Sequence, residues 1–327
     1  MAKVKIKALT GQYEIVRALR EGEVEVEGID LEFLSFPGTR DIHVPEIREA
    51  ADLGEFNAGA YMGNKYRGHA LTALPIFLHR RFRHGFVFIN KSKGIEGPKD
   101  LIGKRIGGTN FAPAGNLWAR GILENDYGVP HSSITWVTER DEDGDFEYHS
   151  DLKVERIGKD QDLDDMLANG DLDAIISPNV ARGITEGDAR IGRLWPNYKD
   201  VEIAYYKATG IFPIMHVTTI RQEIVDEHPW VVDSLIKAFD EAKKIAYRRL
   251  TNPRIVPLAW YMEAWEEQEK ILGPDPWEYG LSDQNRKTLA NMAKYSHEQA
   301  LIKNDLSVDD LFLDVSQGRK RGEEFRV

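Results

Sequence analysis

The densest group of side chains that could do chemistry is the run His79-Arg80-Arg81-Phe82-Arg83-His84. Guanidinium groups bind carboxylates through two parallel hydrogen bonds, and imidazoles exchange protons near neutral pH. In an extended segment, side chains two apart share a face, which groups Arg81 with Arg83 and Phe82 with His84. We therefore predict that Arg81 and Arg83 bind a carboxylate and that His84 is a general acid or base. The alternative is a basic surface turn that pairs with nearby acids.

A second candidate acid or base is His216, in the apolar segment FPIMHVTTIR. A histidine in such a strand is often a hydrogen-bonded core residue, which is the alternative here. We expect this segment to run beside the first one and to bring His216 near His84. The proton donor would then be one of these two histidines, and the other would contact a phenolic group.

The turn Gly107-Gly108-Thr109-Asn110 precedes a predicted helix that begins near Ala114. Because helix N-termini present unpaired N–H groups, we predict an anion site there, with Asn110 and Phe111 against the ligand. Trp118, one helical turn beyond Ala114, is a candidate floor of the pocket. Nucleotide binding is not indicated, since neither GxGxxG nor GxxxxGK[ST] occurs.

Further candidate ligand contacts lie where predicted strands end or helices begin, the places at which open α/β sheets bind ligands. These substrate-binding candidates are Tyr13, Arg17, Tyr61, Ser177, Asn179 and Phe212.

Metal and nucleophile motifs are missing from the chain. It has no cysteine, no HExxH and no GxSxG, so thiolate and serine-triad chemistry are not indicated. We predict no cofactor and no metal ligand. A divalent-metal site assembled from distant residues, such as His84, His216 and an acid, is left open.

Strand-like and helix-like segments alternate along the chain, which is typical of βαβ units and a mainly parallel sheet. KVKIKAL and IDLEFLSF indicate strands, and YEIVRALREG indicates the helix between them. The segment 141–151 is acidic and is predicted to be a solvated loop. From Tyr205 onward, one returning strand and several long helices follow.

We therefore predict an α/β fold of two lobes that close like a clamshell on a ligand. Residues 1–90 and 205–327 would form lobe one, and residues 91–204 would form lobe two. The chain would cross between them twice, near residues 84–92 and 204–217, and the ligand would lie in the cleft.

Composition narrows the function classes. Apolar residues make up 42% and charged residues 30% of the 327 positions, which suits a globular protein. A net charge of −11 disfavours nucleic acid as a partner. No stretch approaches the ~20 apolar residues of a membrane span, and the N-terminus lacks an apolar signal core. We expect a cytoplasmic location, no membrane partner, and leave a homo-oligomer open.

Eight segments in order along nearly the whole chain resemble the 4,5-dihydroxyphthalate decarboxylase family, whose members have the fold of type 2 periplasmic binding proteins. They are YEIVRALREGEVEVEGIDLEFL, LPIFLHRRFRHGFVFIN, DLIGKRIGG, LWARGILENDYGV, LDAIISP, FPIMHVTTIR, HPWVVDSLIKAF and NRKTLANMAKYSHEQAL.

The resemblance implies a small aromatic carboxylate as ligand and non-oxidative loss of CO₂ from a hydroxylated aromatic acid. The alternative is a solute-binding or sensor protein for a small carboxylate, because the same fold serves receptors. One segment departs from the family pattern: Thr109–Gly115 is more apolar than expected beside the Gly-rich turn.

Overall fold

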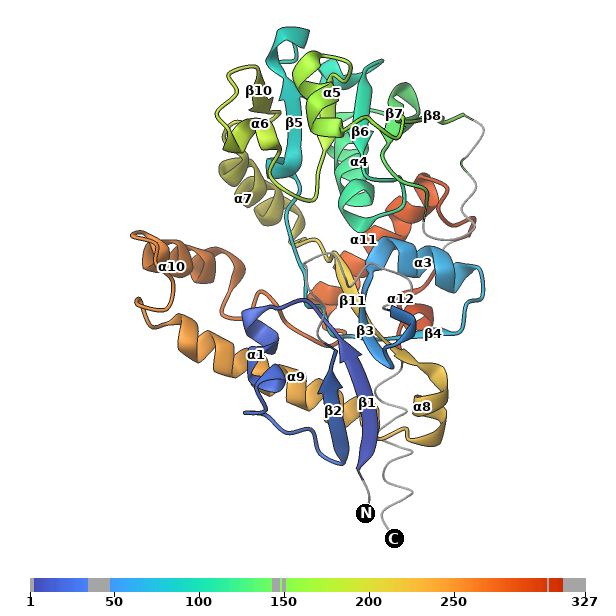
Figure 1. Ribbon diagram of the computed structural model, residues 1–327, viewed down its shortest axis with the longest axis vertical. Coiled ribbons are helices and arrows are strands. Elements are labelled where there is room, and N and C mark those ends of the chain that lie inside the picture. The colour runs from blue at the N-terminus through green and yellow to red at the C-terminus, as the bar shows by residue number, and fades with distance from the viewer. Residues whose placement is uncertain (1–2, 35–47, 143–147, 149–150, 305, 314–327) are drawn as a thin grey trace.

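The computed structural model describes residues 3–34, 48–142, 148, 151–304 and 306–313, and these form two sheets, one in each half of the molecule (Figure 1). The first sheet has the order β2-β1-β3-β11-β4. Its strands are β1 (Val4–Leu9), β2 (Ile29–Phe33), β3 (Leu53–Asn57), β4 (Leu71–Leu74) and β11 (His216–Arg221). β1 pairs in parallel with β2 and β3, whereas β11 returns antiparallel between β3 and β4.

The second sheet has the order β10-β5-β9-β6-β7-β8. Its strands are β5 (Val87–Asn90), β6 (Arg105–Gly108), β7 (Thr135–Thr138), β8 (Lys153–Arg156), β9 (Ala174–Ile176) and β10 (Ile191–Arg193). β6 to β9 are parallel to one another, and β5 and β10 are antiparallel to their neighbours. β5 thus belongs to the second sheet, although the sequence placed residues 87–90 at the end of lobe one.

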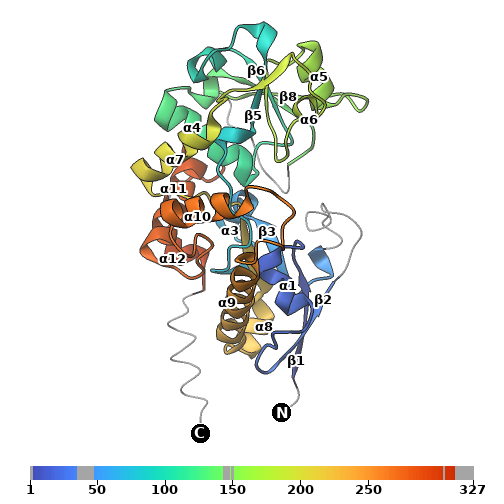
Figure 2. The ribbon, with the colours of Figure 1, turned by 90° about the vertical axis from the view of Figure 1, so that its left-hand side faces the viewer.

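Helices cover both sheets (Figure 2). The larger ones are α1 (Glu14–Arg20), α3 (Ala58–Tyr66), α4 (Ala114–Tyr127), α7 (Tyr198–Thr209), α9 (Val231–Leu250), α10 (Tyr261–Leu272) and α11 (Asp283–Glu298). Short ones are α5 (Leu163–Asn169), α6 (Arg182–Thr185), α8 (Gln222–Glu227) and α12 (Val308–Leu311), with 3₁₀ turns η2 (His84–Phe86), η3 (Lys91–Lys93), η4 (Pro98–Leu101) and η5 (His131–Ser133). α9 is amphipathic, and its apolar face packs on α1 and the first sheet. In the part of the chain that is described, no helix meets the length and apolarity of a membrane span.

The two segments that connect the sheets, residues 75–86 and 210–215, run side by side. Arg80 and Ile214 form an antiparallel bridge, and the Arg81 N–H donates to the carbonyl of Pro213 at 3.0 Å. The buried guanidinium of Arg80 donates to Oδ1 of Asn285 at 2.5 Å, at the start of α11. Arg80 therefore fixes the first connecting segment to α11, one of the C-terminal helices.

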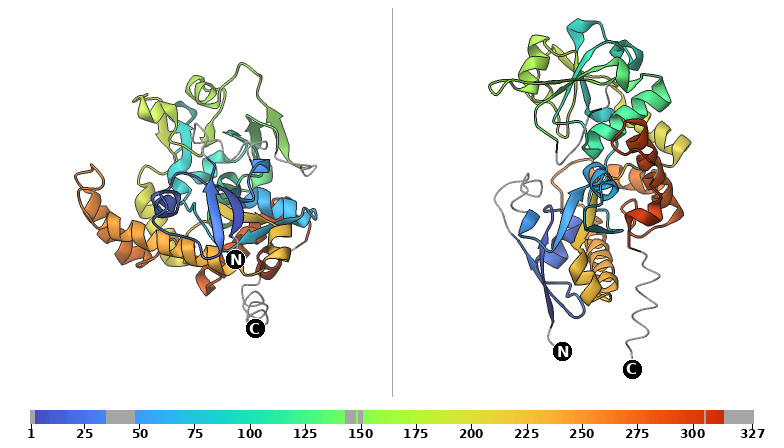
Figure 3. Two further views of the ribbon diagram at one scale, coloured as in Figure 1. Left: turned by 60° about the horizontal axis from the view of Figure 1, so that its bottom comes forward. Right: turned by 90° about the vertical axis from the view of Figure 1, so that its right-hand side faces the viewer.

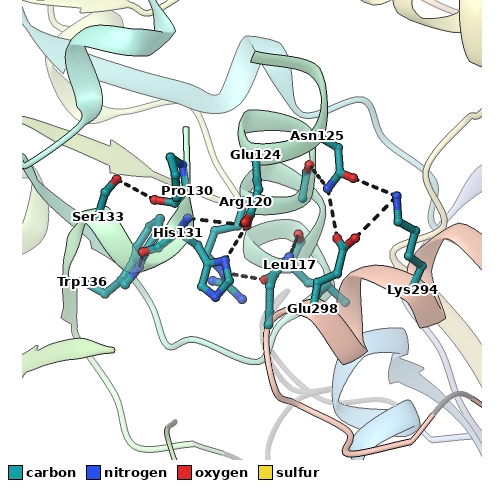
Figure 4. Close-up of polar contacts among 12 residues, drawn as sticks. Leu117, Arg120, Glu124, Asn125, Pro130, His131, Ser133, Trp136, Lys294 and Glu298 are labelled. Atoms are coloured by element: carbon teal, nitrogen blue, oxygen red, sulfur yellow. Dashed lines mark hydrogen bonds and ion pairs between the residues drawn. The ribbon is translucent and has the colours of Figure 1, made fainter. Parts of the chain in front are cut away.

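Polar side chains join α4, which packs on the second sheet, to α11 (Figure 4). Asn125 Nδ2 donates to Glu298 at 3.0 Å, and Lys294 donates to Oδ1 of Asn125 at 2.8 Å. The preceding residue of α4, Glu124, pairs with Nδ1 of His131, which gives that histidine a structural role.

α3 of the first half meets the turn before α4 so closely that only glycine fits at residue 59. A Cβ added to Gly59 would lie 2.4 Å from the backbone carbonyl oxygen of Ala112. One turn later, a Cβ on Gly63 would first meet the guanidinium of Arg67 at 3.2 Å, a side chain that can move.

Gly59→Ala is therefore expected to lower the free energy of unfolding by about 1–3 kcal/mol, because two backbones must separate. Gly63→Ala in the same helix should instead lie within about 1 kcal/mol of wild type, since alanine favours helix. Denaturant titration of both variants checks this. Equal stabilities for the pair would contradict a tight contact at Gly59.

Candidate functional site

A cavity of about 940 Å³ opens at the carboxyl end of β1, against the first connecting segment and α10. Its described lining comes from the β1–α1 turn, the connecting segment, the end of α9, and α10. The lining residues with polar groups are Thr10, Gln12, Tyr13, Glu14, Arg20, His79, Arg80, Arg81, Tyr247, Tyr261 and Gln268, with Trp265 and Trp277 among the apolar ones.

Behind the cavity lies a buried acid, Glu55 on β3. Its Oε1 accepts hydrogen bonds from the hydroxyl of Tyr13 at 2.8 Å and from Nδ1 of His216 at 2.5 Å, and its Oε2 accepts one from the N–H of Gly11 at 2.9 Å. Burial alone would raise the pKa of Glu55, but His216 and the two other donors hold that pKa below its usual value. Glu55 is therefore a carboxylate at neutral pH, and His216 donates to it through Nδ1.

His79 stands between this pair and the cavity. Its ring meets the ring of His216 edge-on, with centroids 4.7 Å apart, and the centroid of the Tyr13 ring lies 6.3 Å away. Its carbonyl accepts the N–H groups of Met215 at 2.9 Å and of His216 at 3.3 Å, which fixes the two histidines on adjacent segments. The arrangement joins an ionised carboxylate, a buried imidazole and a second imidazole that lines a cavity.

His79 and Glu55 are functional candidates that sequence reasoning missed. A signal existed for His79, because alternation places it on the face of Arg81, and both line the cavity. Glu55 had only a weak signal, an acid inside an otherwise apolar strand.

Arg81 and Arg83, predicted as one carboxylate clamp, have different places. Arg81 lines the cavity, its guanidinium lies over Phe86 at 4.7 Å, and Nη1 donates to the carbonyl of Pro178 at 2.6 Å. Arg83 is buried, donates to the carbonyl of Ser177 at 2.8 Å and is not among the described residues that line the cavity. Burial lowers the pKa of Arg83 to about 9. Arg83 thus joins the first connecting segment to Ser177, which follows β9, and of the two predicted arginines only Arg81 lines the cavity.

His84 is not the neighbour of His216, contrary to our expectation. It begins η2, is 1% exposed, and lies among the rings of Trp195, Tyr205 and Tyr127 at 5.1, 5.2 and 6.4 Å. Among the described residues, neither ring nitrogen has a hydrogen-bond partner, and burial lowers the pKa of His84 to about 4. This imidazole is neutral at pH 7 and packs as a core ring.

Several cavity-lining residues carry buried polar atoms that have no hydrogen-bond partner within the described chain. Among these atoms are Oγ1 of Thr10, Oε1 of Glu14, Nη1 of Arg20, Nε of Arg80 and the hydroxyl of Tyr261. Buried polar groups almost always have a partner, so these atoms are expected to bind a ligand or water. Arg20 and Arg81 supply positive charge in this cavity.

Comparisons with known proteins indicate the family of this chain. Residues 15–143 match the family described as NMT1/THI5 like. A 4,5-dihydroxyphthalate decarboxylase of Comamonas testosteroni is 29% identical over 97% of this chain and 98% of its own. Another of that name, from Pseudomonas putida, is 32% identical over 64% of this chain and 83% of its own. The chain belongs to the 4,5-dihydroxyphthalate decarboxylase family.

Solved structures similar to this family member show its fold class. The periplasmic aliphatic sulphonate binding protein SsuA of Escherichia coli aligns with a TM-score of 0.56 and 11% identity over 95% of this chain and 97% of its own. A putative periplasmic sulfonate-binding protein of Methylobacillus flagellatus also has a TM-score of 0.56, with 14% identity over 99% and 96% of the two chains. The predicted fold of a type 2 periplasmic binding protein is confirmed.

Several residues predicted to contact the ligand have structural partners in this family member. Arg17 is half exposed and pairs with Glu21 at 2.7 Å, away from the cavity lining. Tyr61 is buried and donates to the carbonyl of Leu311. Trp118 is fully buried and donates to the carbonyl of Ile214 at 3.0 Å, so it supports the second connecting segment.

The remaining predicted contacts lie outside the lining as well, with Tyr13 the exception. Phe212 packs on Phe82 and Trp277, with centroids 4.7 and 5.2 Å away, behind the cavity wall. In the second half, Ser177 accepts the N–H of Asn179 at 3.1 Å through Oγ. Asn110 is buried at the turn after β6.

The predicted anion site at the Gly-rich turn is filled by the chain's own carboxylate. Glu142 accepts the N–H groups of Phe111 and of Ala112, the latter at 2.9 Å, and the hydroxyl of Tyr148 at 2.8 Å. The N–H of Ala114, at the start of α4, donates instead to Oδ1 of Asn57 at 2.9 Å. Part of the predicted solvated loop therefore packs on the turn; its residues 143–147 and 149–150 lie outside the described ones.

Glu142→Gln is expected to lower the free energy of unfolding at pH 7 by about 1–2 kcal/mol, because charge-assisted hydrogen bonds become neutral ones. Asp141→Asn is the matched control, since the side chain of Asp141 is 98% exposed and, among the described residues, forms a surface ion pair with Arg156 at 3.7 Å. Thermal and denaturant unfolding of both variants measure the difference. Equal effects would mean that the carboxylate of Glu142 is dispensable at this turn.

Among the described residues, Glu55, His79 and His216 are also the group that could hold a metal, with one ligand atom from each within 4.8 Å of the others. Two imidazoles and one carboxylate suit a first-row divalent ion. In this arrangement the hydrogen bonds from Gly11, Tyr13 and His216 already satisfy the carboxylate of Glu55, and we assign no cofactor to the family member.

Proposed function

We propose that this protein is an aromatic acid decarboxylase that removes CO₂ from a hydroxylated phthalate-like acid by protonating the ring. The observation that carries the proposal is the cluster of His79, His216 and Glu55 beside Arg81 at one cavity, in a chain related over nearly its full length to a protein named 4,5-dihydroxyphthalate decarboxylase. The cavity volume and its aromatic lining suit a small ring with charged substituents.

The chemistry needs a proton at the carbon that carries the carboxylate. A hydroxyl para to this carbon pushes electron density into the ring, and a positioned acid adds a proton there. The bond to the carboxylate then breaks, its electron pair restores the aromatic ring, and CO₂ leaves. In sum, one proton replaces one CO₂, with no oxidant, reductant or cofactor in the balance.

We assign the proton transfer to His79, because it lines the cavity while His216 lies behind it. As an imidazolium, His79 gives its proton to the ring and becomes neutral, and solvent returns the proton after CO₂ leaves. Glu55 would orient His216 through Nδ1, and the His216 ring, 4.7 Å from that of His79, would in turn hold His79 in place at the cavity.

Arg81 is assigned to a carboxylate of the substrate, with Arg20 as a second cation at the cavity. Guanidinium groups recognise carboxylates in two-point geometry, which would fix the ring orientation relative to His79. The hydroxyls of Thr10 and Tyr261 are available for the polar groups of the ring. Enclosure of the substrate by α10 would exclude water from the protonated intermediate.

The test is incubation of the full chain with 4,5-dihydroxyphthalate, with phthalate lacking hydroxyls, and with monohydroxybenzoates, followed by mass spectrometry. The proposal expects loss of one CO₂ from acids that carry a hydroxyl para to a carboxylate. Thermal stabilisation by an intact acid without any product would instead identify a binding protein for small carboxylates.

A further inference from the structure

The turn between β1 and α1 brings a tyrosine hydroxyl to the cavity wall. The cavity opens between the carboxyl end of β1 and the helices α9 and α10, which extend from the first half of the molecule (Figure 3). Tyr13 lines it, and so does Gly11 two residues earlier. The ring of Tyr13 lies back over Gly11: a Cβ added there would lie 2.5 Å from a ring carbon and 2.8 Å from the hydroxyl oxygen. The hydroxyl end of the ring therefore belongs to the cavity wall.

The proton of this hydroxyl already has an acceptor. It is donated to Oε1 of the buried, ionised Glu55 at 2.8 Å. Burial, and after it the charge of Glu55, raise the pKa of Tyr13, so the hydroxyl stays protonated at neutral pH. Because its single proton points at Glu55, the oxygen of Tyr13 can only accept a further hydrogen bond. The hydroxyls of Thr10 and Tyr261 have no partner among the described residues, so they can rotate to donate or to accept.

Tyr13 also stands next to the proposed proton donor, since its ring centroid lies 6.3 Å from that of His79. A second tyrosine at the cavity, Tyr247, likewise donates to a carboxylate, Oδ1 of Asp275 at 3.1 Å. Its ring, however, packs on Trp265 of α10, with centroids 5.7 Å apart. One small ring can therefore have His79 at a ring carbon and Tyr13 at a hydroxyl.

We propose that Tyr13 binds the ring hydroxyl of the substrate and passes its proton to Glu55 while His79 protonates the ring. The assignment rests on the proposed function, which supplies the ring protonation. The substrate hydroxyl donates to the oxygen of Tyr13, and Tyr13 donates to Glu55, so two hydrogen bonds in series end on a carboxylate. Arg81 lines the same cavity and would hold a carboxylate of the substrate, so different groups recognise the two kinds of substituent.

The proton transfers balance. Protonation by His79 gives the ring a positive charge, and its hydroxyl then becomes far more acidic than a carboxylic acid, so even a carboxylate of low pKa can take up the proton. The O–H bond of the substrate breaks, its electron pair stays on the oxygen, which becomes a carbonyl, and the proton moves to Tyr13 as the proton of Tyr13 moves to Glu55. When CO₂ leaves, the electron pair of the broken C–C bond restores the aromatic ring. The substrate oxygen then takes a proton back from Tyr13, and Glu55 returns one to Tyr13.

Binding is the first test, and the His79→Asn background keeps the acid intact during the titration. Calorimetry compares 4-hydroxyphthalate with phthalate, which lacks the hydroxyl. His79→Asn should bind the hydroxylated acid about tenfold more tightly, the usual effect of one hydrogen bond. Adding Tyr13→Phe should bring the two dissociation constants within about twofold of each other. Adding Tyr247→Phe, the matched control, should retain the preference.

Failure of His79→Asn to favour the hydroxylated acid, or a preference that survives Tyr13→Phe, would overturn the assignment. If Tyr13→Phe does not fold, Gly11→Ala takes its place in the same comparison. A Cβ at residue 11 leaves the tyrosine hydroxyl in the protein but forces the ring from its position, so this variant should also lose the preference.

Turnover tests the proton transfer itself. At pH 7, Tyr13→Phe should lower kcat by about 10²-fold or more, the usual contribution of a proton-transfer group. A substrate whose hydroxyl is already ionised needs no acceptor, so the ratio of wild-type to variant kcat should fall about tenfold per pH unit toward pH ~10, the usual pKa of a phenol. A ratio that stays constant with pH would reduce Tyr13 to a structural role and refute the transfer. A wild type that releases no CO₂ would refute decarboxylation instead, and the binding comparison would still decide whether Tyr13 recognises a ring hydroxyl.

Discussion

His79→Asn is expected to lower kcat for ring decarboxylation by about 10²- to 10⁴-fold, the usual loss when a positioned general acid is removed. Asparagine keeps a polar side chain at the cavity but cannot deliver a proton to carbon. The proposed contact between Arg81 and a substrate carboxylate is left intact, so KM should change much less than kcat. Steady-state turnover of 4,5-dihydroxyphthalate by wild type and variant measures both constants.

The matched control is His69→Asn, because His69 is an exposed histidine outside the described cavity lining. It should leave kcat and KM unchanged. His84→Asn should also retain the chemical step, since His84 lies in an aromatic core, although the variant is expected to be less stable. Full activity in His79→Asn together with inactivity in His84→Asn would return the acid role to His84.

The fold was predictable because its signals are local. Period-two strands, amphipathic helices and Gly or Pro boundaries indicated alternating elements, and the segment containing His216 indicated a returning strand. The boundary between the two lobes was harder to predict from the sequence. Val87–Asn90 is a uniformly buried strand, and nothing in its composition says which of two sheets it joins.

The site was only partly predictable because two of its contacts depend on geometry that the sequence does not carry. Alternation from His79 would hold only if the segment stayed extended, but η2 begins at His84 and turns that ring into the core. The bond between Glu55 and His216 arises from strand register: His216 lies opposite Asn57 on β3, which makes Glu55 its diagonal neighbour.

The two halves of the predicted clamp separated for a similar reason. Arg81 and Arg83 share a face only in extended backbone, and Arg83 immediately precedes η2. Its guanidinium therefore finds the carbonyl of Ser177 rather than the cavity. The unexpected occupant of the anion turn, Glu142, comes from a loop about 30 positions away, and such a contact leaves no periodic trace in sequence.

His84→Phe is expected to remove an acid-dependent loss of stability from the protein. In the folded chain, burial lowers the pKa of His84 from 6.5 to about 4. The unfolded chain therefore binds a proton as the pH falls through 6.5, whereas the folded chain does not until about pH 4. Across this window the wild type should lose up to about 3 kcal/mol of unfolding free energy through this group, a loss absent above pH 6.5.

Phenylalanine preserves the packing against Trp195 and Tyr205 and removes two buried nitrogens that have no partner among the described residues. The free energy of unfolding of His84→Phe at pH 7 should thus be close to that of wild type. The difference in favour of the variant should grow steadily from pH 6.5 to pH 4. Asparagine in His84→Asn packs poorly, so this variant should have a lower free energy of unfolding than His84→Phe at every pH. It also lacks the titrating imidazole, so the fall of its unfolding free energy from pH 6.5 to pH 4 should be as small as that of His84→Phe. Denaturant unfolding of all three proteins at pH 7, 5.5 and 4.5 separates the two effects. Parallel curves for wild type and both variants would mean that His84 is protonated in the folded state, and hence less enclosed than its aromatic surroundings indicate.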